Sequence, residues 1–364
     1  MWGRTGHSRA ALLGEHMAER ATERSGKQRP SAVLPEPDAA LRKVPVPGSP
    51  TPGIPAALAE DMTPHAVAAK AAHENFPVAL RMLPRTYRHH LMAVYVFART
   101  ADDLGDQAPA AERLALLAEL EADVKALYAS FGGSGAETAA GEPGQDGEPG
   151  HAGAPGQPAR RPQPAVAGLR RTVLECEIPM QPFVDLIRAN QQDQVVTRYQ
   201  TFEDLAGYCR LSANPVGRIV LHVFGQYTAD RADQSDYVCT GLQLAEHWQD
   251  VAEDLRAGRI YLPLEDMAVH GCGEDDLAAP HAGPMVRELM AFEVGRARSL
   301  IDAGAPLVGT LRGAARAAVA GYVAGGRAAL TAIDTAGYDV MAVTPRPGKG
   351  RTLVELARAF ARGR

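Results

Sequence analysis

The sequence predicts an all-α protein, and three observations support this expectation. Strand-like alternation of polar and apolar residues is almost absent along the chain. Residues 111–128 instead repeat apolar side chains with a helical period. One side of that helix carries Leu114, Leu117, Leu120, Val124 and Leu127. Similar helical patterns resume at Pro164 and continue to the end of the chain.

The helices follow one another in chain order. The first clear one contains the apolar run that begins at Ala93 and ends in a group of carboxylates. The helix over residues 111–128 comes next. Beyond Pro164, we expect helices at 181–190, from 201 onward, and at 235–255, 283–303 and 311–336. Thr201 and Asp204 have the spacing of a capping box, and Pro215 should break the helix that contains it because it lacks a backbone donor.

Composition divides the chain into parts. Residues 1–60 are rich in Pro, Gly, Arg and Ala, so we expect a disordered arm before a folded domain over 61–345. An insertion at 131–165 interrupts this domain, and glycine occupies every third position of residues 141–158. Six such triplets are too few for a collagen helix, so we expect a disordered surface loop. Over residues 346–364 we expect a basic C-terminal helix or tail.

A polar stripe marks the end of the first helix. Tyr95, Arg99, Asp102 and Asp106 follow each other at intervals of four, three and four residues, which places them on one helix face. Two carboxylates one turn apart suit Mg²⁺, which prefers oxygen ligands and bridges carboxylates to phosphates. By helix geometry Asp103 points away from this stripe, so we expect it to support the metal ligands and not to bind the metal itself. The alternative is a solvated acidic face.

A second stretch has the same design. Asp250 and Asp254 are again four residues apart, after an apolar lead-in. Two such turns on facing helices could hold several Mg²⁺ ions, with Mn²⁺ as a substitute, and clamp a diphosphate. A diphosphate clamp above an apolar helical pocket indicates ionisation chemistry on an isoprenoid. The four aspartates are therefore our candidate metal ligands.

The overall composition excludes other classes of function. A net charge of −5 gives no reason to expect nucleic-acid binding. The four cysteines lack CxxC spacing, so we expect reduced thiols in a cytoplasmic protein. No segment has the roughly 18 apolar residues of a membrane span, although a lipid substrate favours loose attachment to the inner membrane face. No glycine motif for a dinucleotide is visible, so we expect no NADPH.

These motifs resemble those of the squalene/phytoene synthase family. Residues 95–106 resemble its first aspartate-rich motif, and residues 249–255 resemble its second. Further resemblance lies in residues 74–77, 208–218, 258–263 and 336–340. The likeness covers about residues 60–345 apart from the insertion. Within the family, the sequence is similar to the bacterial HpnC branch of hopanoid-linked squalene synthesis.

The resemblance implies a single-domain, α-helical trans-isoprenyl diphosphate synthase fold of the head-to-head type, with a central cavity. It also implies Mg²⁺-dependent conversion of presqualene diphosphate to hydroxysqualene, with release of diphosphate. Companion enzymes of the squalene pathway would make the substrate and reduce the product. The alternatives are another head-to-head synthase, making presqualene diphosphate, phytoene or diapophytoene, and a non-catalytic assembly factor. Retention of both aspartate pairs argues against the assembly factor.

The resemblance also implies roles for individual residues. Arg99, Gln249, Arg259 and Tyr261 are expected to bind the substrate diphosphate. Arg99 could instead form a structural salt bridge, and Arg259 and Tyr261 could make ordinary helix-end contacts. Tyr95 is expected to stabilise developing positive charge or to hydrogen-bond the leaving group, with a core tyrosine as the alternative. Many relatives carry Asn where this chain has Glu246.

Asn214 is our third candidate catalytic residue, after Tyr95 and Arg99. It is polar, lies within a largely apolar run and immediately precedes Pro215. Its amide could hold the water that captures the cation; the alternative is that it caps the helix break. In this interpretation His89 and His90 precede the first helix and have no partner at metal-ligand spacing. We therefore expect them to be surface or capping residues.

Overall fold

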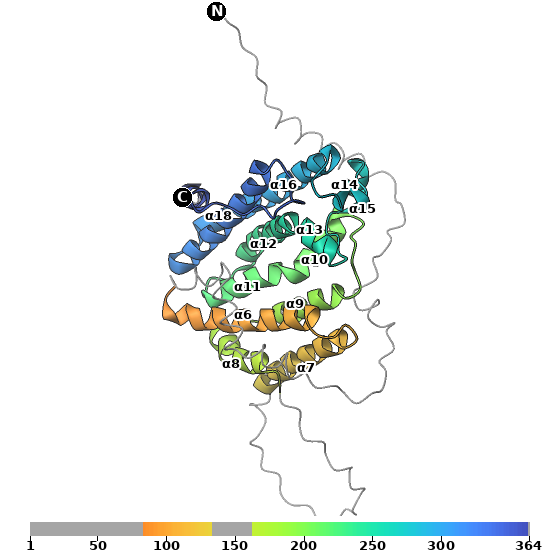
Figure 1. The fold of residues 1–364 in the computed structure, drawn as a ribbon. Helices are drawn as coiled ribbons and strands as arrows, with labels where there is room; N and C mark the ends of the chain where they lie inside the picture. The colour runs from red at the N-terminus through yellow and green to blue at the C-terminus, as the bar shows by residue number, and fades with distance from the viewer. Residues whose placement is uncertain (1–82, 133–161, 363–364) are drawn as a thin grey trace, which may run out of the picture. The chain divides into compact units, whose positions relative to one another are not determined.

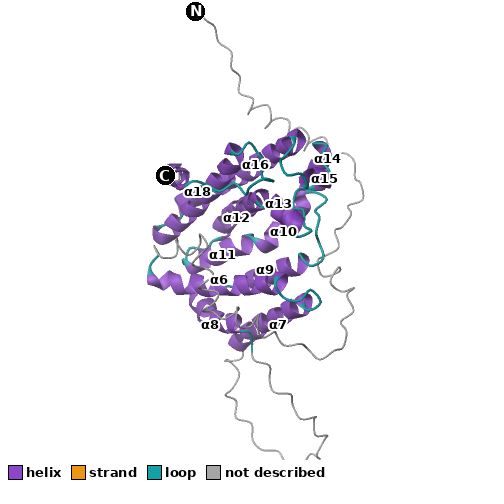
Figure 2. Ribbon diagram, in the orientation of Figure 1, coloured by secondary structure: helices purple, strands orange, loops and turns teal. Residues whose placement is uncertain are grey.

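The computed structural model describes residues 83–132 and 162–362, and all the regular elements in these ranges are helices (Figures 1 and 2). One isolated bridge joins Arg198 to Ile260. The all-α prediction is therefore confirmed. The helices are α6 (Arg85–Asp106), α7 (Arg113–Gly132), α8 (Pro164–Cys176), α9 (Gln181–Gln192), α10 (Phe202–Ser212), α11 (Asn214–Val223), α12 (Ala229–Gln249), α13 (Val251–Arg256), α14 (Leu264–Val269), α15 (Glu274–Leu277), α16 (Pro284–Gly304), α17 (Leu307–Thr310), α18 (Gly313–Thr335) and α19 (Lys349–Arg362).

Helix α6 has a buried apolar side and a polar side, as its residue pattern requires. The buried side carries Leu91, Val94, Phe97, Ala101 and Leu104. The helix begins at Arg85, so the expectation that His89 and His90 precede it is wrong. Both histidines belong to its first turns, and His90 is buried. Pro84 sets this earlier start, because a proline suits the position just before a helix but not its interior.

The break at Pro215 is confirmed. Helix α10 ends at Ser212 and α11 begins at Asn214. Ala213 is the residue before α11 and offers no side-chain cap. The alternative that Asn214 caps the break is therefore wrong. The capping box at the start of α10 is confirmed, since the Thr201 hydroxyl accepts from the backbone N–H of Asp204 at 3.1 Å.

Helix α12 lies between α11 on one side and α16 and α18 on the other (Figure 1). Glycines let these helices approach closely. A Cβ on Gly304 of α16 would come within 2.5 Å of the carbonyl oxygen of Gln234 on α12. A Cβ on Gly241 of α12 would come within 2.6 Å of Ile301. This close packing buries Trp248 completely and fixes the end of α12, where the second carboxylate motif lies.

Several sequence expectations concern the chain outside this core. Helix α19 occupies the segment for which we expected a basic helix or tail, and it packs against α18. The expected N-terminal arm, and most of the expected loop at 131–165, lie outside the described residues. In the described ranges, no helix is both long enough and apolar enough to cross a membrane.

Candidate active site

The first carboxylate motif is supported by Asp103. This side chain is 1 % exposed, and its Oδ1 accepts from Arg99 Nε at 3.0 Å and from Gln107 Nε2 at 2.6 Å. The structural salt bridge considered as an alternative for Arg99 is therefore present. It also fixes the guanidinium on the polar side of α6, one turn before Asp102. Asp103 thus has the supporting position that helix geometry predicted.

Asp102 is exposed to solvent. Desolvation by the surrounding protein is the main reason that its pKa rises to about 6, and the nearby Asp106 charge raises it further. Asn190 on α9 opposes this shift by donating a hydrogen bond to Asp102 Oδ1 at 3.1 Å. Gly105 allows the contact, because a Cβ there would come within 2.7 Å of Asn190 Oδ1. Sequence reasoning missed Asn190, which no motif signals.

An ion pair connects the first motif with the segment just after the second motif. Arg259 Nη2 lies 3.0 Å from Asp106 Oδ1, although the residues are 153 positions apart. Arg259 follows the turn after α13, and Gly258 allows that turn with a φ of 82°. The structure therefore brings Arg259, from the sequence just after the second motif, to the last aspartate of the first motif. This contact supports the expectation that the two carboxylate turns face each other.

The second motif differs in detail from the predicted continuous helix. The backbone at Asp250 leaves the helical region with φ −106° and ψ 14°, which separates α12 from α13. The backbone N–H of Asp254 still donates to the carbonyl of Asp250 at 2.8 Å, so the pair keeps its one-turn spacing. Burial raises the pKa of Asp250 to about 6, and the charges of Glu246, Asp254 and Glu253 raise it further.

A layer of buried aromatic residues lies beside the second motif. The Tyr261 ring stacks on His247 with centroids 3.8 Å apart, and His247 Nδ1 lies 3.8 Å from Asp254 Oδ2. Tyr261 donates its hydroxyl to Asp193 Oδ1 at 3.2 Å, and Tyr208 donates to Asp193 Oδ2 at 2.6 Å. Burial raises the pKa of the Asp193 carboxyl. Sequence reasoning missed Asp193, because the predicted helix ended at residue 190, before this lone carboxylate.

Three other candidate residues have contacts of their own. Gln249 donates its side-chain amide to the carbonyl of Pro345, in the segment after α18. Asn214 is buried, and its Oδ1 accepts from the Thr240 hydroxyl at 2.9 Å. Tyr95 is half-buried on α6 and packs against the small apolar cluster around Val96. Each is therefore held by the fold. The substrate-binding role of Gln249 and the catalytic roles of Asn214 and Tyr95 stay predictions.

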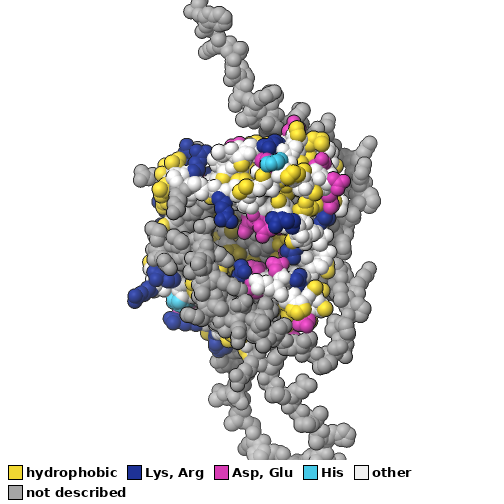
Figure 3. Space-filling view, viewed as in Figure 1, with side chains coloured by type: hydrophobic (Ala, Val, Ile, Leu, Met, Phe, Trp, Pro, Cys, Tyr) yellow, Lys and Arg dark blue, Asp and Glu magenta, His cyan; other side chains and the backbone are white. Residues whose placement is uncertain are grey.

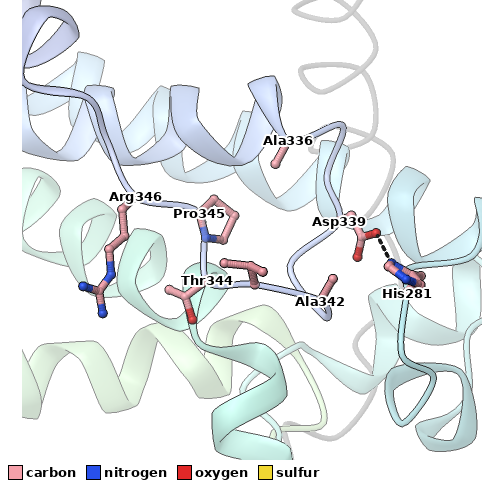
Figure 4. A pocket seen from close by; sticks show the side chains of 8 residues that line it. His281, Ala336, Asp339, Ala342, Thr344, Pro345 and Arg346 are labelled. Atoms are coloured by element: carbon pink, nitrogen blue, oxygen red, sulfur yellow. Dashed lines mark hydrogen bonds and ion pairs between the residues drawn. The ribbon is translucent and has the colours of Figure 1, made fainter.

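The surface at this site is hollowed. Figure 3 shows Asp and Glu side chains on two opposite sides of a depression, with hydrophobic side chains deeper inside. A cavity of about 10 Å³ lies beside the second motif, lined in part by Asp254 and Tyr261. A wider depression of about 750 Å³ lies along residues 336–346 and includes His281, which pairs with Asp339 at 3.1 Å (Figure 4). Pro345, whose carbonyl holds Gln249, is part of its lining.

The donors of the two motifs suit a hard divalent cation. All four predicted ligands are carboxylates, and the raised pKa values of Asp102 and Asp250 reflect, beyond burial, crowded negative charge. No three of the motif carboxylates in the described ranges have oxygens within 4.8 Å of one another. Mg²⁺ binds through one or two carboxylates and completes its shell with water and substrate phosphate, so the two aspartate pairs need not converge on one point to hold it.

An all-α fold that brings the segment after the second carboxylate turn to the first is the arrangement expected of an α-helical isoprenoid synthase. The chain belongs to the squalene/phytoene synthase family, whose model matches residues 69–357. The resemblance stated from the motifs is thereby confirmed.

Individual relatives and solved structures agree with this assignment. Hydroxysqualene synthase of Rhodopseudomonas palustris is 31 % identical over 66 % of this chain and 72 % of its own length. Phytoene synthase of Arthrospira platensis is 30 % identical over 62 % of this chain and 68 % of its own. The crystal structure of squalene synthase HpnC from Alicyclobacillus acidocaldarius is similar with a TM-score of 0.63 and 36 % identity, over 78 % of this chain and 97 % of that one. A dehydrosqualene synthase, at 21 % identity and a TM-score of 0.67 over 84 % of this chain and 97 % of its own, supports the fold.

Proposed function

We propose that this enzyme converts presqualene diphosphate to hydroxysqualene and releases diphosphate, with Mg²⁺ as cofactor and no NADPH. The observation that carries the proposal is the Arg259–Asp106 contact, which brings the segment just after the second carboxylate motif to the first motif. The hydroxysqualene synthases among the relatives support the choice of product. The reaction belongs to squalene and hopanoid synthesis, where companion enzymes make the substrate and reduce the product.

The four motif aspartates would hold the metal. Mg²⁺ bound there, or Mn²⁺ in its place, would supply the positive charge that makes diphosphate a better leaving group. Arg259 brings a guanidinium to the same place, and guanidinium groups bind phosphate oxygens in a fork. Arg99 adds a second cation one helical turn from Asp102, held in position by Asp103.

The aromatic layer positions these groups. Asp193 receives the hydroxyls of Tyr208 and Tyr261, so both rings are fixed beside the second motif. Tyr261 is 7 % exposed, and its ring stacks on His247. The apolar interior of the depression excludes bulk water from the cation that forms when diphosphate leaves.

Asn214 is the residue that we propose to hold the capturing water. The Thr240 hydroxyl donates a hydrogen bond to Asn214 Oδ1, which orients the side-chain amide. The amide nitrogen can then donate to a single water molecule. Capture of the cation by that water yields an alcohol rather than a hydrocarbon.

Product identification tests the function. Purified protein is incubated with Mg²⁺ and, separately, with presqualene diphosphate, farnesyl diphosphate or geranylgeranyl diphosphate, and the products are separated by gas chromatography with mass detection. We expect hydroxysqualene from presqualene diphosphate. Presqualene diphosphate or diapophytoene from farnesyl diphosphate, or phytoene from geranylgeranyl diphosphate, without hydroxysqualene in the first reaction, would assign a different head-to-head reaction. No turnover of any substrate would favour the assembly-factor alternative.

We also propose loose attachment to the cytoplasmic membrane face through α19. Leu353 is 67 % exposed and Val354 is 46 % exposed, on the helix that also carries the exposed Arg351 and Arg358, which both pair with Glu355. Exposed apolar and basic side chains on one helix suit an anionic lipid surface. Sedimentation with anionic vesicles tests this: Leu353→Ser with Val354→Ser should reduce the bound fraction, and unchanged binding contradicts the proposal.

A further inference from the structure

A second cluster of metal-ligating side chains lies at the opposite end of α6 from the aspartates. In the described ranges, His89, His90 and Glu175 are the one group of three whose ligand atoms all lie within 4.8 Å of one another. His90 Nε2 is 3.3 Å from Glu175 Oε2, and His89 Nε2 is 3.9 Å from the same oxygen. Two helices supply the cluster, since the histidines belong to α6 and the glutamate to α8.

The distances from the two imidazole nitrogens to the Glu175 oxygen are close to those in a zinc site. With bonds of about 2.0–2.2 Å and tetrahedral angles, two ligand atoms of one Zn²⁺ ion lie roughly 3.3–3.5 Å apart. The His90–Glu175 distance already has this value. The His89–Glu175 distance is longer by about half an ångström, and both side chains are exposed enough to adjust, at 42 % and 46 %.

The other ring nitrogens are held as they are in zinc proteins. His89 Nδ1 lies 3.2 Å from the carbonyl oxygen of Arg85, which can only accept, so Nδ1 is the donor and the lone pair of a neutral ring is on Nε2. His90 Nδ1 lies 3.0 Å from the hydroxyl of Thr172, which is 1 % exposed. Both rings therefore direct Nε2 toward the carboxylate.

The carboxylate is also oriented from behind. Arg171 Nε donates to Glu175 Oε1 at 2.7 Å, which leaves Oε2 facing the two imidazoles. Outer partners of this kind orient the ligands of metal sites. Two imidazoles and one carboxylate are typical ligands of Zn²⁺, whereas Mg²⁺ prefers oxygen alone. The chemistry of this cluster thus differs from that of the four aspartates.

We propose that His89, His90 and Glu175 form a site for Zn²⁺ that joins the start of α6 to the end of α8. The site is separate from the proposed diphosphate site, since it shares no ligand with it. Three protein ligands leave a fourth position for water on the exposed side of His89. Because the metal binds only the folded pair of helices, it stabilises the helix that carries Asp102 and Asp106.

Metal titration of the full-length protein tests the proposal. Co²⁺ serves as a spectroscopic probe through its visible absorption, and Zn²⁺ is measured by competition, in millimolar Mg²⁺ so that oxygen-ligand sites are filled. The variants are His89→Gln and Glu175→Gln, both at exposed positions. The matched control is His281→Gln, which removes another exposed imidazole that pairs with a carboxylate at 3.1 Å.

We expect one Zn²⁺ per chain at this site, with affinity at least about tenfold lower in His89→Gln and in Glu175→Gln. The control should bind as the unaltered protein does. Zn²⁺ should raise the melting temperature of the unaltered protein and the control, but not of the two variants. Equal affinity in all four proteins, or an equal loss in the control, would overturn the proposal. Neither readout depends on enzymatic activity, so failure here is distinct from failure of the proposed function.

Discussion

Replacing Asp250 by asparagine should stabilise the fold while it removes activity. Asp250 lies between α12 and α13, where burial and the charges of Glu246, Asp254 and Glu253 raise its pKa from 3.8 to about 6. A raised pKa means that ionising this carboxylate costs free energy in the folded state. Asparagine has a similar shape and no charge, so it avoids this cost.

The size and sign of the effect follow from proton binding. Between about pH 4 and pH 6 the folded state binds more protons at Asp250 than the unfolded state, so the free energy of unfolding falls as pH rises through this window. Raising a pKa from 3.8 to about 6 corresponds to a loss of about 3 kcal/mol in the free energy of unfolding. Solvent screening at this half-exposed position reduces the loss to about 1 kcal/mol. A gain of about 1 kcal/mol raises the melting temperature of a domain of this size by about 2–4 °C.

The assay is thermal melting of the unaltered protein and Asp250→Asn at pH 4 and pH 7.5, with and without Mg²⁺. We expect the variant to melt about 2–4 °C higher at pH 7.5, but equally at pH 4. Mg²⁺ should stabilise the unaltered protein more than the variant, and diphosphate release by the variant should be lost. Asp233→Asn, on the exposed side of α12, is the control for removing one negative charge. A variant that melts lower at pH 7.5, or that keeps full activity, refutes the reasoning.

Three further predictions follow from single contacts. Arg259→Gln should lower the rate of diphosphate release by about 10–100-fold, because the lost charge-assisted hydrogen bond is worth about 1.5–3 kcal/mol. The free energy of unfolding should change by less than about 1 kcal/mol, as read from the melting temperature. Release at the wild-type rate would contradict the diphosphate role. Asn214→Gly should cost about 1–3 kcal/mol of stability, because Thr240 loses its acceptor, and should shift products of presqualene diphosphate away from hydroxysqualene, as read by gas chromatography. An unchanged hydroxysqualene fraction would exclude the water-holding role. Gly304→Ala should lower the free energy of unfolding by about 1–3 kcal/mol, because its Cβ would meet the Gln234 carbonyl at 2.5 Å. Thermal or urea unfolding measures this loss, and the product ratio should stay unchanged. An unchanged free energy of unfolding would show that α12 and α16 can separate without cost.

Local sequence patterns determined the helices and much of the site. Apolar spacing on α6 requires one buried face, so the polar stripe with Asp102 and Asp106 falls on the other. Thr201 and Asp204 mark a helix start, and Pro215 marks a break, because caps and prolines act on their own backbone neighbours. The family and the class of enzyme followed from the two aspartate motifs.

Only the tertiary structure decided which distant residues meet. Asn190 at Asp102, Arg259 at Asp106, and Asp193 between two tyrosines join positions far apart in the chain, and no local pattern encodes such pairs. The cluster of His89, His90 and Glu175 was missed for the same reason, since Glu175 lies on a different helix from the two histidines. Spacing along one helix shows which side chains share a face, but the packing of a second helix against that face determines their partners.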